Sequence, residues 1–127
     1  MSVSYHISPD ERIVHLATDA APSFEEWRDA MQSLLSDPAF ETGFDFLSTR
    51  GPGVGPPSAE FTNMAAAFYR NNQARFGHCR WAAVVAGDAT TYDSIRKLAL
   101  MSDGTDIHVM VFRDADEAHE WLVGGRR

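Results

Sequence analysis

The chain has 127 residues, of which 44% are hydrophobic and 23% are charged, and its formal net charge is -7 at pH 7. This length and composition fit one globular domain, residues 1–127, with a sizeable core. The negative charge argues against nucleic acid and against membranes as partners, because Lys and Arg dominate binding to their phosphate groups.

Two features predict the cellular compartment. The longest apolar runs, residues 81–86 and 107–112, are too short to cross a bilayer, and the first residues lack the basic and apolar parts of a signal peptide. The single cysteine, Cys79, excludes an internal disulfide and fits a reducing compartment. We therefore expect a cytoplasmic protein.

The first elements in chain order are two short strands. Apolar residues alternate with polar ones over residues 3–7, and a second segment of this kind begins at Ile13. Between them, Ser8 and Pro9 open a segment that is typical of a type I turn. The sequence therefore predicts an antiparallel hairpin at the start of the chain.

Amphipathic helices and apolar strands alternate after this hairpin. Ser23 and Glu26 have the form of a capping box at the start of a helix, and Pro38 marks its end because the residue before proline avoids the helical region. The later strands are predicted over residues 44–47, 81–86 and 107–112, and the later helices are predicted to begin at Ser58, after Asp88 and at Asp114.

The resulting order is β-β-α-β-α-β-α-β-α. Alternating strands and helices predict an α/β fold with a mostly parallel central sheet, to which the first hairpin adds an antiparallel pair. Residues 81–86 are apolar without alternation, so we expect them to form a central strand that is covered on both faces.

Three segments carry a resemblance to a known family. They are the opening hairpin, residues 34–40 (LLSDPAF) and residues 111–122 (VFRDADEAHEWL). Together with the element order, they resemble the SpoIIAA-like branch of the STAS (sulfate transporter and anti-sigma antagonist) fold in its small, stand-alone bacterial form. The resemblance implies a non-enzymatic regulatory domain that binds proteins, with a kinase or a sigma-regulatory protein as partner.

The same resemblance implies a phosphorylated serine at the start of the second helix, and Ser58 occupies that place. An ordinary N-cap role explains Ser58 as well. Small domains of this kind often pair through an exposed helix or strand, so a homodimer stays open as an alternative to a monomer.

The segment STRGPGVGPPSAE, residues 48–60, lies between a predicted strand and a helix, where phosphate-binding loops occur. Each of its three prolines removes a backbone N–H donor, and its glycines follow neither the P-loop nor the dinucleotide-binding spacing. We interpret it as a structural turn, with a loop that contacts a ligand or partner as the alternative. The residues of this loop that would make such contacts are Ser48, Thr49, Arg50 and Gly53.

The alternative function is a carrier or sensor of a small apolar or anionic ligand, held in a pocket between the second helix and the sheet. Phe61, Met64 and Phe68 follow helical spacing on the inner face of that helix and are the candidates to line the pocket, together with Tyr69 at the boundary of that face. Such a stripe forms protein core more often than a binding site. We keep both interpretations.

Catalytic and metal-binding patterns are not found in the sequence. The five histidines show no spacing typical of metal ligands, and no G-x-S-x-G motif is present. His78 and Cys79 are adjacent, and neighbours on an extended chain point to opposite faces. We therefore predict no metal, no cofactor and no enzymatic activity.

Overall fold

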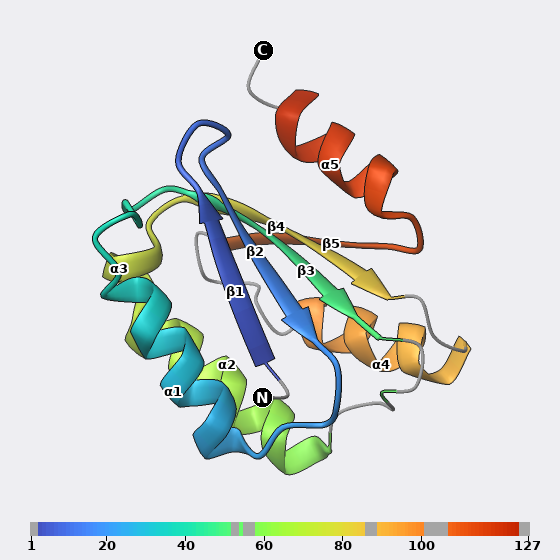
Figure 1. Ribbon diagram of the computed structural model, residues 1–127. Coiled ribbons are helices and arrows are strands. Elements are labelled where there is room, and N and C mark those ends of the chain that lie inside the picture. Colours follow the sequence, from blue (N-terminus) through green and yellow to red (C-terminus); the bar gives the residue numbers. More distant parts are fainter. Residues whose placement is uncertain (1–2, 52–53, 55–57, 86–88, 101–106, 125–127) are drawn as a thin grey trace.

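The computed structural model describes residues 3–51, 54, 58–85, 89–100 and 107–124. These residues form a five-stranded sheet with helices on both sides (Figure 1). The strands are β1 (Val3–Ser8), β2 (Ile13–Thr18), β3 (Asp45–Arg50), β4 (Cys79–Val85) and β5 (Ile107–Phe112). The helices are α1 (Phe24–Leu35), α2 (Ala59–Asn71), α3 (Gln73–Phe76), α4 (Ala89–Leu100) and α5 (Ala115–Gly124).

The strands lie in the sheet in the order in which they occur in the chain, β1-β2-β3-β4-β5. β1 pairs with β2 in the antiparallel direction, and each later pair is parallel. The backbone N–H of Arg12 donates to the Pro9 carbonyl oxygen (3.2 Å) and closes the turn between β1 and β2. The predicted α/β fold, with a mostly parallel sheet and an antiparallel hairpin, is therefore confirmed.

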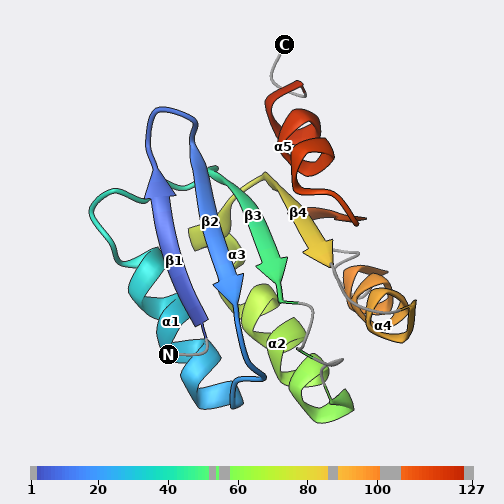
Figure 2. The same cartoon turned by 45° about the vertical axis from the view of Figure 1, so that its right-hand side comes forward.

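Helices cover the two faces of the sheet unequally (Figure 1, Figure 2). α1, α2 and α4 lie on one face, which we call the α2 face, and α5 lies on the other, the α5 face. Alternate residues of a strand point to opposite faces, so Trp81 of β4 joins the core on the α2 face and Ala82 joins the core on the α5 face. The prediction that this strand is covered on both faces is confirmed.

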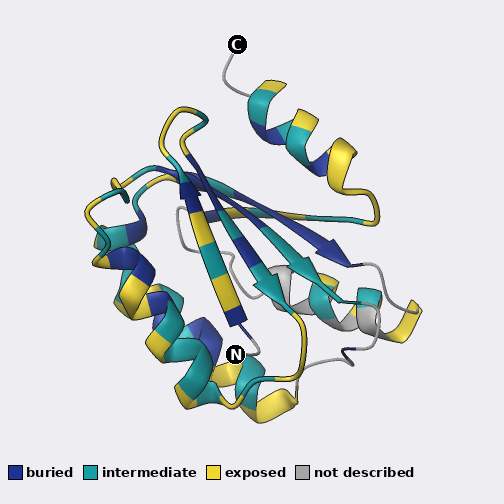
Figure 3. Cartoon of the chain, in the orientation of Figure 1, coloured by how far each residue is buried: buried dark blue, intermediate teal, exposed yellow. Residues whose placement is uncertain are grey.

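Burial follows the same arrangement. β4 is buried along most of its length, whereas β1 alternates between buried and exposed positions (Figure 3). β1 is an edge strand, and its residues on the α5 face, Ser4 and His6, are exposed. The larger of the two cores lies on the α2 face, between the sheet and the helices, and a smaller one lies under α5.

The limits of α1 agree with the prediction. Ser23 Oγ accepts a hydrogen bond from the Glu26 backbone N–H (3.1 Å), and the helix ends at Leu35. In the turn that follows, the Asp37 carboxylate accepts hydrogen bonds from the Ala39 N–H (2.9 Å) and the Tyr5 hydroxyl (3.1 Å). The first bond stabilises the turn, and the second links the turn after α1 to β1.

The third strand is longer than its apolar run indicates. We predict residues 44–47 as strand, but β3 runs over Asp45–Arg50, so Ser48, Thr49 and Arg50 belong to the sheet and not to a loop. Backbone pairing explains the difference, because these three residues pair with β2 on one side and with β4 on the other. Their side chains therefore alternate between the two faces.

The structure adds a short helix to the predicted order, and one prediction for the second helix is wrong. The chain forms two helices, α2 and the short α3, because Asn72 ends α2 by donating its backbone and side-chain N–H groups to the Phe68 carbonyl oxygen (3.0 and 2.9 Å). Met64 does not face inward: its side chain is 36% exposed, whereas the next residues, Ala65 and Ala66, are buried. Alanine, and not methionine, thus faces the sheet at this point of α2.

The described helices are short. Within residues 3–51, 54, 58–85, 89–100 and 107–124, none has the length and apolar character needed to cross a bilayer.

Candidate ligand pocket

A cavity of about 130 Å³ lies on the α2 face between α2 and the sheet, partly open to solvent. It is at the carboxyl ends of the parallel strands β2, β3 and β4, the edge at which open α/β sheets commonly bind ligands. The cavity therefore lies where the predicted carrier or sensor would hold its ligand.

Two rows of side chains from the sheet form the floor of the cavity. In each row, residues of β2, β3 and β4 are neighbours in the register of the parallel strands. The row at the strand ends consists of Thr18, Arg50 and Val85, and the row behind it consists of Leu16, Ser48 and Ala83. The central side chain of each row is polar: Ser48 in the inner row and the cationic Arg50 in the row at the strand ends.

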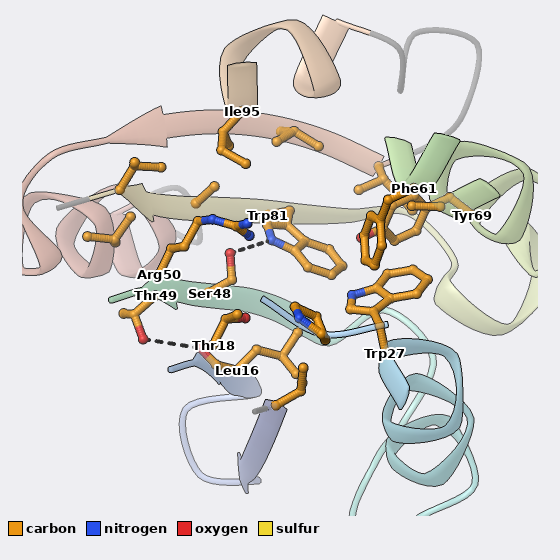
Figure 4. A pocket seen from close by; sticks show the side chains of 18 of the residues that line it. Leu16, Thr18, Trp27, Ser48, Thr49, Arg50, Phe61, Tyr69, Trp81 and Ile95 are labelled. Atoms are coloured by element: carbon orange, nitrogen blue, oxygen red, sulfur yellow. Dashed lines mark hydrogen bonds between the residues drawn. The ribbon is translucent and has the colours of Figure 1, made fainter. Parts of the chain in front are cut away.

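Four aromatic rings form a wall at one side of this floor (Figure 4). Trp27 comes from α1, Phe61 and Tyr69 come from α2, and Trp81 comes from β4. The Trp27 ring makes edge-to-face contacts with Phe61 and Tyr69 at centroid distances of 5.6 and 5.7 Å, and Tyr69 meets Trp81 at 5.4 Å. Edge-to-face contacts of this kind hold each ring in one orientation.

Trp81 is fixed from two further sides. Its ring stacks on Phe46 with a centroid distance of 4.5 Å and an interplanar angle of 10°. Its indole N–H donates to Ser48 Oγ at 2.9 Å. Because Ser48 itself lies on the floor, this hydrogen bond joins the aromatic wall to the polar part of the cavity.

Small side chains on α2 leave the space open. Ala65 and Ala66, which line the cavity from above, are 1% and 5% exposed, and Ala83 faces them from the sheet. A methyl group fills little of the distance between a helix and a sheet, since protein interiors are otherwise packed to crystal-like density. The cavity therefore results from alanine at positions where the neighbouring core has large side chains.

Arg50 is the cationic group of the cavity. It is half-buried, and burial lowers the pKa of its guanidinium, which still stays protonated at neutral pH. Among the described residues that line the cavity, no other carries a formal charge, and none is acidic.

The structure brings together some of the residues that the sequence analysis singles out. Ser48, Arg50 and Phe61 line the cavity, and Thr49 borders it but directs its hydroxyl away, as donor to the Leu16 carbonyl oxygen (3.3 Å) (Figure 4). The other candidates differ in position. Met64 is exposed, Phe68 is part of the packed core, and Gly53 lies outside the described residues.

Ser58 lies at the first turn of α2. It is exposed, and its Oγ accepts a hydrogen bond from the backbone N–H of Phe61 at 3.0 Å. The predicted N-cap role is confirmed. Phosphorylation of Ser58 stays a prediction.

Sequence reasoning missed Trp27 and Trp81 of the aromatic wall, because both are typical core residues by pattern, whereas it included Tyr69 among the residues that could line a pocket. One signal was available in Ala65 and Ala66, two small residues at inward positions of an otherwise aromatic-rich helix. A second signal was the spacing of Phe46, Ser48 and Arg50. These residues are two positions apart, so all three lie on the same face if the strand continues through Arg50.

Other titratable groups lie outside the cavity. Burial raises the pKa of the Cys79 thiol to about 12, so this group stays protonated at neutral pH. On the α5 face, Glu11 Oε2 forms a 2.6 Å hydrogen bond with His119 Nε2, and Glu11 Oε1 lies 3.5 Å from His15 Nε2. In the part of the chain that the structure describes, no group of three such side chains is arranged to hold a metal ion.

Comparison of the chain with protein-family models, with curated proteins and with solved structures finds no match. The resemblance to SpoIIAA-like domains therefore stays a prediction, and the function has to be argued from the site itself.

Proposed function

We propose that this protein is a binding domain, a carrier or a sensor, for a small and largely apolar molecule held between α2 and the sheet. The cavity of about 130 Å³ beside the aromatic wall carries this proposal. An apolar cavity of about 150 Å³ accommodates a benzene ring in another protein, so the space here suits one six-membered ring or a chain of similar size.

A filling substitution tests the proposal directly. Ala65→Leu adds side-chain volume inside the cavity, whereas Ala67→Leu adds the same volume on the same helix at a position that does not line it. We expect wild-type protein and Ala67→Leu to bind members of a panel of aromatic and aliphatic molecules with about six to ten non-hydrogen atoms. We expect Ala65→Leu to lose this binding while remaining folded.

Two readouts make the result clear. Tryptophan fluorescence reports on the cavity because Trp27 and Trp81 line it, and the melting temperature reports both folding and stabilisation by ligand. If no member of the panel changes either signal in the wild-type protein, or if Ala65→Leu binds as well as Ala67→Leu, the proposed function is wrong.

A second candidate function is association with a regulatory protein, controlled by phosphorylation of Ser58. One observation favours it: Ser58 is exposed at the N-terminus of α2, where added negative charge is favourable. Incubation with a serine kinase encoded beside this gene is expected to add one phosphate, and Ser58→Ala is expected to abolish the addition. A chain that acquires no phosphate, or that acquires it equally in the variant, contradicts this function.

Both functions describe a domain that binds without catalysing a reaction. The buried free thiol of Cys79 is compatible with the reducing cytoplasm, which we propose as its location.

A further inference from the structure

The aromatic wall of the cavity carries polar atoms as well as apolar rings. Two of these atoms are the indole nitrogen of Trp27, from α1, and the hydroxyl oxygen of Tyr69, from α2. The two rings meet edge to face at a centroid distance of 5.7 Å, so both atoms belong to one part of the wall. An indole N–H can only donate a hydrogen bond, and a phenol hydroxyl can donate one as well.

Neither atom has a hydrogen-bond partner among the residues that the structure describes. Trp81, in the same wall, differs from Trp27, because its indole N–H donates to Ser48 Oγ at 2.9 Å. Trp and Tyr side chains that are removed from water usually find such a partner for their polar atom. The wall therefore holds two donors that the described part of the protein does not use.

Both donors can be reached from outside the protein core. In the described part of the chain, every fully enclosed side-chain nitrogen or oxygen has a partner, so the Trp27 nitrogen and the Tyr69 oxygen are not fully enclosed. Both residues line the cavity, and Figure 4 shows the Trp27 nitrogen on the side of its ring that is directed towards the middle of the cavity. A molecule in the cavity can therefore accept hydrogen bonds from this part of the wall.

The two donors indicate which polar group a ligand carries. Burial raises the pKa of the Tyr69 hydroxyl above its ordinary value of 10.0, so this group keeps its proton and can donate at physiological pH. A ligand group that only donates would leave the Trp27 N–H unpaired, whereas an oxygen acceptor satisfies it. An uncharged acceptor also costs less to remove from water than an ion does.

We infer that the pocket selects small uncharged carbonyl compounds, ketones or aldehydes with one ring or a short apolar chain, whose oxygen accepts a hydrogen bond from the donor pair Trp27 and Tyr69. This inference rests on the proposed function. The apolar body would lie over the space that Ala65 and Ala66 leave open. The carbonyl oxygen would take the place of water at the two donors and reproduce its hydrogen bonds.

Two uncharged probes of the same shape test the inference. Acetophenone carries a carbonyl oxygen, and 2-phenylpropene has a CH₂ group in place of this oxygen. Calorimetric titration of the full chain measures the affinity for each probe, and the ratio of the two affinities is compared between proteins. The cost of removing each probe from water is the same for every protein, so it cancels in this comparison.

Variants assign the ratio to the two donors. Trp27→Phe and Tyr69→Phe each remove one donor and keep an aromatic ring. We expect each to lower the affinity for acetophenone, relative to that for 2-phenylpropene, by roughly twofold to tenfold, the range of one uncharged hydrogen bond. Binding of 2-phenylpropene shows that each variant is folded. Trp121→Phe and Tyr92→Phe make the same changes at residues that do not line the cavity and should leave the ratio unchanged.

The outcomes separate this inference from the proposed function. A lower ratio in either cavity variant supports the inference, and the larger effect identifies the main donor. If neither variant lowers the ratio, or if the wild-type protein binds 2-phenylpropene or other panel molecules but not acetophenone, the pocket binds small molecules without selecting carbonyl compounds, and only the inference is wrong. If neither probe binds and the wider panel also fails, both the inference and the proposed function are wrong.

Discussion

The core between the sheet and the helices of the α2 face has two halves that differ in packing. Towards the amino ends of the parallel strands it is filled, with Phe46 and Phe76 fully buried. Towards the carboxyl ends, where Ser48 and Arg50 occupy the next positions of β3 on the same face, it is hollow. One strand therefore contributes to a stabilising core at its start and to a candidate binding site at its end.

Packing also changes along α2, from a filled core at its end to the cavity at its middle. Its last turns bring Phe68 into the filled half, and its middle presents Ala65 and Ala66 to the hollow half. In both β3 and α2, therefore, one part stabilises the fold and another part lines the candidate binding site. Substitutions in the two halves should therefore have different effects, which the following predictions use in order of decreasing size.

The largest effect is expected from truncation of a ring in the filled half. Phe46→Ala removes a side chain with no exposure and the stacking partner of Trp81, and should lower the free energy of unfolding by about 3 to 5 kcal/mol. Phe61→Ala, at a partly buried position of the wall of the hollow half, should cost only about 1 kcal/mol. Urea unfolding compares the two variants. Equal losses would remove the distinction between the halves.

An intermediate effect is expected from Ser48→Ala. The substitution leaves the Trp81 indole N–H without its acceptor, which should lower the free energy of unfolding by about 1 to 2 kcal/mol. The Trp81 ring should also become less fixed, so binding of the panel molecules should weaken. Ser33→Ala, at an exposed position of α1, provides the control. Chemical unfolding and fluorescence titration measure both effects, and unchanged binding would show that the Ser48–Trp81 bond does not shape the pocket.

A similar or slightly smaller loss is expected from Ser58→Ala. Removing this N-cap frees the Phe61 backbone N–H and should cost about 1 kcal/mol. Ser58→Asp keeps an acceptor at the cap and should preserve the stability of the wild-type protein. Thermal unfolding of the three proteins checks the order. If Ser58→Asp is as unstable as Ser58→Ala, the cap does not hold the start of α2.

The smallest effect concerns the α5 face, away from both halves of this core. The hydrogen bond from His119 lowers the pKa of Glu11 below its ordinary value of 4.5. Glu11 therefore contributes its full stability above that pH, and the contribution is lost as the pH falls through the lowered pKa of the folded state. Because the side chain is 40% exposed, the contribution should remain below about 1 kcal/mol.

Glu11→Gln removes this carboxylate. The stability difference from the wild-type protein should be visible at pH 7 and should shrink in acid, while ligand affinity stays unchanged. Unfolding curves at several pH values measure the difference. A change in ligand affinity would show that the α5 face is coupled to the cavity on the α2 face, and would contradict the separation of the two faces.

Local signals in the sequence predict the fold well. Ser23, Ser58 and Asp114 each precede a helix that the structure contains, and in each case the side chain accepts a hydrogen bond from a backbone N–H of the first turn. The apolar strand over residues 107–112 has the predicted limits. These features depend on neighbouring residues and on hydrophobic periodicity, which a single sequence contains.

The pocket depends on contacts between distant parts of the chain. Ser48, Thr49 and Arg50 read as loop because they are polar, and only pairing with β2 and β4 extends the strand through them. Trp27 and Trp81 come from separate elements and meet around Tyr69 only in the folded state. A sequence pattern gives their types and spacing but not the volume left between them.

A crystal structure of the protein grown with a molecule of the panel that binds it tests the central claim most directly. The account predicts one such molecule in the cavity, lying against Trp27 and Phe61. A cavity closed by shifted side chains, or the molecule bound only elsewhere on the protein, would contradict the claim that the hollow half of the core is a binding site.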